Sequence, residues 1–180
     1  MNKEPIVFFP GIVFHELSHV LACHLTGVKV RNVKWFGVDE AYVQHDKPRA
    51  LQGLFISIAP FLFGNFLGFE LFLFGHELVT KASVFAIPIY WFAFSLLLYS
   101  FPSKQDAMNA FDSFVSFYKK KVIEKGSLVT RLLWALTFPV FFVPVILILG
   151  FILLFDSAFI LRILWVFTLI GLSVYPSTLI

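Results

Sequence analysis

Residues 6–25 read IVFFPGIVFHELSHVLACHL, an apolar run that is long enough to cross a bilayer and that contains the string HELSH. In a helix His15 and His19 point within about 40° of each other, because each residue turns the chain by about 100°. Two such imidazoles can share one zinc ion, and the adjacent Glu16 can act as a general base. Ionisable side chains inside a membrane span are costly and mostly functional. This segment therefore predicts a membrane helix that carries a metal site.

The composition extends the membrane expectation to the whole chain. The 180 residues are 59% hydrophobic and 14% are charged, against about 25% charged in soluble domains. We expect one integral membrane domain over residues 1–180. The first apolar run lacks a small-residue cleavage site, so we expect this segment to stay in the mature protein. The net charge of +3 is small and the basic residues follow no nucleic-acid-reading pattern, so nucleic acid is not an expected partner. The single cysteine, Cys23, excludes an internal disulfide.

The apolar stretches predict an all-α polytopic membrane protein with about five transmembrane helices. These stretches cover residues 6–25, 51–74, 83–101, 130–155 and 159–178. Only Asp156 and Ser157 separate the last two before the apolar pattern resumes, so they predict either a tight hairpin of two spans or one span with a re-entrant piece. Alternating residues at 28–35 and a β-prone run at 41–45 predict a small β-hairpin after the first span.

The basic residues predict the orientation in the cell membrane. Most of the 14 Lys and Arg residues fall in the loops 26–50 and 102–129. The positive-inside tendency places these loops in the cytoplasm and the N-terminus outside. Residues 112–125, which end in a lysine-rich stretch, are expected to lie along the lipid surface. On this topology Asp156, His76 and Glu77 fall on the outer side, away from His19.

Zinc held by two imidazoles needs a third protein ligand and an open position for water. His24 points about 180° from His15 and is excluded. The remaining candidates on the cytoplasmic side are Asp39, Glu40, His45, Asp46, Asp106 and Asp112. Asp106 is favoured, because Pro102 can end the third span and turn the chain back toward the site. Asn109 would share a helical face with Asp106 and is expected to orient its carboxylate.

Roughly the first 110 residues resemble the site-2 protease family of intramembrane metalloproteases. The resemblance rests on HELSH at 15–19 with Ala22, Gly27 and Val30 after it, on Tyr42-Val43 in the hairpin, and on Pro102 four residues before Asp106. It implies that His15, His19 and Asp106 bind one zinc ion. It also implies that Glu16 is the catalytic base.

Two positions depart from the family pattern. The family aspartate is usually followed by Gly, whereas Ala107 follows here. The second core span of the family usually carries Gly-Pro with Asn three residues after the proline, whereas Asn65 lies five residues after Pro60. Asn65 is therefore expected either to position a substrate or to pack as a buried polar group. Gly64 and Gly68 are expected to let this span approach the metal helix closely.

The expected activity is zinc-assisted hydrolysis of a peptide bond near the cytoplasmic face, in a membrane-embedded or membrane-adjacent segment of a protein or peptide substrate. Tyr42 and Val43 lie in a hairpin that is either merely solvated or offers an edge to an unwound substrate strand. The alternative is a non-proteolytic zinc-binding membrane protein that scaffolds a partner. Five scattered histidines disfavour a di-iron site, and the lack of paired inverted halves disfavours a transporter. The oligomeric state stays open.

Overall fold

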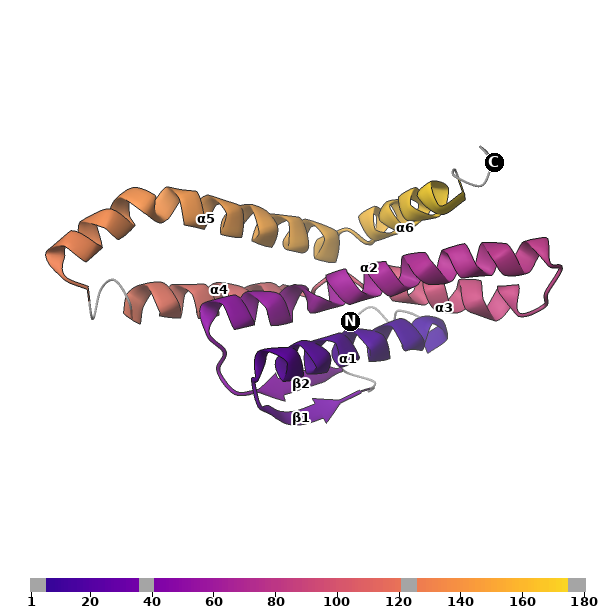
Figure 1. Cartoon of the computed structure of the whole chain (residues 1–180), viewed down its shortest axis with the longest axis horizontal. Coiled ribbons are helices and arrows are strands. Elements are labelled where there is room, and N and C mark those ends of the chain that lie inside the picture. Colours follow the sequence, from indigo (N-terminus) through magenta and orange to yellow (C-terminus); the bar gives the residue numbers. More distant parts are fainter. Residues whose placement is uncertain (1–5, 36–40, 121–125, 175–180) are drawn as a thin grey trace.

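The computed structural model describes residues 6–35, 41–120 and 126–174, and these are mostly helical with one two-stranded antiparallel sheet (Figure 1). The elements are η1 (Ile6–Phe8), α1 (Phe9–Thr26), β1 (Val30–Lys34), β2 (Tyr42–His45), α2 (Ala50–Thr80), α3 (Ala86–Leu98), α4 (Lys104–Tyr118), α5 (Leu128–Ser157) and α6 (Phe159–Val174). The predicted helical fold and the hairpin after the first helix are confirmed. The candidates Asp39 and Glu40 and the predicted segments 121–125 and 175–178 lie outside the described residues.

The hairpin is placed beside α1 by the way that α1 ends. Gly27 takes a left-handed conformation with φ of 73°, and its N–H donates to the carbonyls of Cys23 and His24. Glycine adopts this conformation at little cost, so the chain leaves the helix sharply and enters β1. Two hydrogen bonds from Arg31 to Asp46 join the outer ends of the hairpin at 2.6 and 2.9 Å and hold the pKa of Asp46 below its ordinary value.

Small residues bring α1 and α2 close to α3. A Cβ atom on Gly11 of α1 would lie 2.1 Å from the carbonyl oxygen of Ser95, and one on Gly64 of α2 would lie 2.8 Å from Cβ of Ser100. Gly68 of α2 packs against Leu97 of α3 in the same way. The expectation that Gly64 and Gly68 face the metal helix is therefore wrong. Instead, the end of α1 packs against the first part of α2. The buried residues of this contact form a cluster of Ala22, Cys23, Val28, Ile56 and Ala59.

The last two helices do not form the predicted tight hairpin. Instead, α5 packs on α4, α6 packs on α2 and α3, and the two follow each other along the long axis of the molecule (Figure 1). Only Ala158 separates them, whereas reversing the chain between two helices takes about 2–5 residues. The expectation that Asp156 lies on the side away from the site is also wrong, because Asp156 Oδ2 accepts a hydrogen bond from the backbone N–H of Lys104.

The helices differ in whether they could cross a membrane. Among the described helices, only α2 is by itself long and apolar enough to do so. The two arms of α5, Leu128–Thr137 and Phe142–Ser157, meet at a 48° bend near Pro139 and would be long enough if they act as one span. The apolar helices α3 and α6 are shorter. The five predicted spans therefore stay a prediction.

Candidate metal centre

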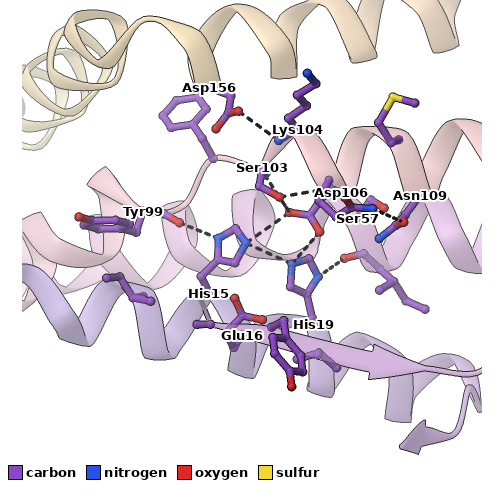
Figure 2. Close-up of a pocket in the computed structure, with 18 of the residues that line it drawn as sticks. His15, Glu16, His19, Ser57, Tyr99, Ser103, Lys104, Asp106, Asn109 and Asp156 are labelled. Carbon is purple, nitrogen blue, oxygen red and sulfur yellow. Dashed lines mark hydrogen bonds and ion pairs between the residues drawn. The ribbon is translucent and has the colours of Figure 1, made fainter. Parts of the chain in front are cut away.

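The structure brings together the three side chains that the sequence singled out as metal ligands. His15 and His19 come from α1 and Asp106 comes from the first turn of α4 (Figure 2). The two Nε2 atoms are 3.1 Å apart, and they lie 3.4 Å (His15) and 3.2 Å (His19) from the carboxylate oxygens of Asp106. One potential ligand atom from each residue lies within 4.8 Å of the others. These residues could hold a single cation.

Backbone carbonyls orient both imidazoles. His15 Nδ1 lies 2.9 Å from the carbonyl oxygen of Tyr99, and His19 Nδ1 lies 2.8 Å from that of Ile56. A carbonyl oxygen only accepts hydrogen bonds, so Nδ1 must carry the proton of each neutral ring. The lone pair of each ring is then on Nε2. With both rings neutral, two lone pairs and a carboxylate face one another, an arrangement that repels itself unless a metal cation or a proton on Nε2 supplies positive charge between them.

The carbonyl that orients His19 is available because of a proline. Pro60 lies inside α2 and has no backbone N–H, so it cannot donate the usual helical hydrogen bond to the carbonyl of Ile56, four residues earlier. His19 Nδ1 donates to that carbonyl instead. The carbonyl that orients His15 belongs to Tyr99, the residue that caps the C-terminal end of α3. Interruptions in two helices therefore provide the acceptors for the two histidines.

Asp106 is oriented by the start of its own helix. Ser103 caps α4, and both its backbone N–H and its hydroxyl donate to Asp106 Oδ2 at 2.8 Å. The N–H of Asp106 donates in turn to the Ser103 hydroxyl at 3.2 Å. This reciprocal arrangement is a capping box, and the spacing Ser-x-x-Asp at 103–106 would have predicted it.

The hydrogen bonds of the described residues give no contact between Asn109 and Asp106, and the orienting role expected for Asn109 stays a prediction. Its side-chain oxygen accepts a hydrogen bond from Gln105 at 3.0 Å, and Ser103 is the residue that orients Asp106. The carboxylate turns back toward the beginning of α4, whereas Asn109 lies almost one helical turn further along. Asn109 still lines the same cavity as the three ligands.

The carboxyl group of Asp106 is charged in this setting. Burial alone would raise its pKa, but when both ring nitrogens carry protons, positive charge on His19 and hydrogen bonds from both imidazoles outweigh burial and hold the pKa of Asp106 well below its ordinary value. An ionised carboxylate is the form that binds a metal ion. A metal cation would replace the imidazolium protons as the positive charge that keeps this carboxylate ionised.

The three ligands open into a cavity of about 720 Å³. Glu16, whose exposed fraction is 7%, lines this cavity beside the two imidazoles (Figure 2). Tyr42 and Val43 of β2 also line the cavity. A second cavity of about 300 Å³ shares Val43 and three further lining residues with the first. The site therefore has a buried acid next to its ligands and room for a substrate.

Asn65 does not line this cavity, so of the two roles expected for it the structure favours packing over substrate positioning. Its side chain donates to the hydroxyl of Ser100 at 3.1 Å and accepts from the indole N–H of Trp165 at 2.7 Å. Asn65 therefore joins α2 to the end of α3 and to α6, which is the packing role that the sequence also allowed. It lies two helical turns beyond Ser57, the last residue of α2 that lines the cavity.

Two cavity residues were missed at the level of sequence. Asp156 and Arg162 line the cavity from the break between α5 and α6. The predicted hairpin of spans put Asp156 on the far side. Asp156 and Arg162 lie six residues apart on either side of the helix break, a spacing that favours an ion pair between them. This pattern is the sequence signal that could have indicated a polar corner at this position.

No family model, curated protein or solved structure matches this chain.

Proposed function

We propose that His15, His19 and Asp106 hold one zinc ion. The observation that carries the proposal is the convergence of two imidazole nitrogens and a carboxylate on one small space. Two histidines and one carboxylate form a ligand set of catalytic zinc sites, in which a fourth position stays open for water. Metal-binding histidines commonly donate their other ring N–H to a carbonyl or carboxylate, as both histidines do here.

We further propose that the chain is a zinc-dependent endopeptidase. When bound, zinc would activate a water molecule and polarise the scissile carbonyl. Glu16 adjoins the ligands in the cavity and is the group that would take a proton from that water and deliver it to the leaving amine. The resemblance of residues 15–19 and 102–106 to the site-2 protease motifs supports the same activity.

The membrane is the proposed location of this activity. Large apolar side chains are exposed along much of α5, including Leu128, Leu132, Leu133, Leu136, Val140, Val143 and Leu147. A water-soluble protein rarely leaves such a continuous apolar surface uncovered, whereas lipid would cover it. The loops 26–50 and 102–129 would face the cytoplasm, as their basic residues predict.

The proposed substrate is an extended segment of a membrane protein or peptide. Within the described residues β2 pairs only with β1, so its other edge has no strand partner. Tyr42 and Val43 of this strand line the cavity that contains the metal ligands. A substrate that has unwound could hydrogen-bond to this edge and pass beside Glu16.

Substitution of Asp106 tests the metal site. The wild-type protein is expected to bind about one zinc ion per chain, and Asp106→Ala is expected to lose most of that zinc, because two imidazoles alone leave the site without its anionic ligand. Metal analysis of purified, chelator-washed protein measures the difference. His24→Ala, which removes an exposed imidazole from the same helix, is the matched control and should retain its zinc. Equal zinc in all three proteins would contradict the proposed ligands.

Substitution of Pro60 separates metal binding from stability. Pro60→Ala restores an N–H that can hydrogen-bond to the Ile56 carbonyl in competition with His19. Zinc affinity should fall about tenfold or more, while the Tm should stay level or rise, because an interior proline disfavours a helix. The control Pro144→Ala removes a proline from α5, away from the site, and should leave zinc affinity unchanged. A Pro60→Ala protein with wild-type affinity would argue against the role of this carbonyl.

Glu16→Gln tests the proposed reaction. The amide keeps the shape of the side chain but cannot take a proton from water, so cleavage of model membrane peptides should fall at least about 100-fold. Zinc content should match the wild type, because Glu16 is not one of the three ligands. Undiminished cleavage would contradict the general-base role. A wild-type protein that binds zinc and a partner but cleaves none of the peptides would favour the scaffold alternative.

A further inference from the structure

Asp156 connects the C-terminal helices to the helix that carries a proposed metal ligand. Its Oδ2 atom accepts a hydrogen bond from the backbone N–H of Lys104 at 3.2 Å. Lys104 is the first residue of α4, and Asp106 lies in the same turn. The first N–H groups of a helix have no partner within the helix, and a carboxylate is a favourable acceptor for them. Asp156, in α5, therefore accepts a hydrogen bond from a backbone N–H at the start of α4 that has no acceptor within its own helix.

Arg162 holds the Asp156 carboxylate in place. Its guanidinium donates to Asp156 Oδ1 at 2.7 Å and to the carbonyl of Phe155 at 2.8 Å. The Arg162 side chain is 11% exposed and the Asp156 side chain is 31% exposed, so this ion pair is partly shielded from water. An ion pair with several hydrogen bonds has a defined geometry. The second oxygen of Asp156 consequently points at α4 (Figure 2).

Aromatic packing holds the same corner against the chain segment before α4. The rings of Phe155 and Phe101 stack with centroids 4.5 Å apart, and Trp165 contacts Phe101 edge to face. Phe101 lies two residues before Ser103, the residue that caps α4 and orients Asp106. The corner between α5 and α6 therefore contacts the ligand-bearing segment through both a hydrogen bond and a ring stack.

We propose that Asp156 is a positioning residue for Asp106, so that the C-terminal helices complete the metal site. The proposal rests on the proposed zinc site. Asp156 binds no metal itself. It holds the N-terminus of α4, and thereby the carboxylate of Asp106, at the distance from the imidazoles that one cation requires. Loss of this contact lets the first turn of α4 shift and weakens binding of the metal.

The test measures zinc affinity by competition with a chelator, together with the visible spectrum of the cobalt-substituted protein, which reports the geometry of the ligands. Asp156→Ala should weaken zinc binding about tenfold or more and change the cobalt spectrum. Asp156→Asn retains an oxygen that can accept from the Lys104 N–H and should recover most of the affinity. Glu77→Ala removes an exposed, ion-paired carboxylate from the far end of α2 and is the matched control.

A second pair of variants tests the donor. Lys104→Pro removes the N–H at the first helical position, where proline is well tolerated, and Ser103 already has the extended conformation that a following proline requires. Lys104→Ala keeps the N–H. The proline variant should weaken zinc binding as Asp156→Ala does, the alanine variant should not, and Asp156→Ala combined with Lys104→Pro should be no weaker than either alone.

The outcomes separate this proposal from the zinc site on which it rests. A wild-type protein without zinc would overturn both. Zinc binding by the wild type, with unchanged affinity and cobalt spectrum in Asp156→Ala and Lys104→Pro, would overturn only the positioning role. If Asp156→Ala does not fold, the pair Lys104→Pro and Lys104→Ala decides the question, because equal affinities in these two variants would also overturn it.

Discussion

The central constraint on this structure is electrostatic: two imidazole lone pairs and a carboxylate occupy one small space. The Nε2 atoms of His15 and His19 lie 3.1 Å apart, and both face the charged oxygens of Asp106. Such an arrangement opposes folding unless a metal cation or protons on the imidazoles offset the repulsion and the surrounding groups hold each ligand in place. The fold supplies that support from the carbonyls of Ile56 and Tyr99 and from the cap of α4.

Helix interruptions are the common means by which the chain builds this support. Pro60 prevents a hydrogen bond inside α2, so that the Ile56 carbonyl is available to His19. The end of α3 offers the Tyr99 carbonyl to His15, and the start of α4 positions Asp106. Close packing of Gly11 on Ser95 then keeps α1 near enough to α3 for these contacts to form. The site thus depends on three helices that meet where their regular hydrogen bonding is broken.

Local geometry explains which parts of the site could be predicted from the sequence. His15 and His19 share a helical face because of their spacing alone, and Pro102 indicated that the chain turns before Asp106. Tertiary placement explains the rest: the role of Asn65 stayed open between substrate positioning and packing, and Asp156 was placed on the far side. Their positions depend on how α5 and α6 lie against α2 and α4, which apolar periodicity does not specify. The backbone carbonyls that orient the histidines carry no sequence signal except Pro60.

X-ray absorption spectroscopy of the zinc-loaded protein identifies the atoms around the metal and so checks the three proposed ligands. The account predicts two imidazole nitrogens at about 2.0–2.1 Å and a carboxylate oxygen at about 2.0–2.2 Å, with the scattering of one imidazole lost in His19→Ala. A sulfur ligand at about 2.3 Å, or a spectrum without imidazole scattering, would contradict it.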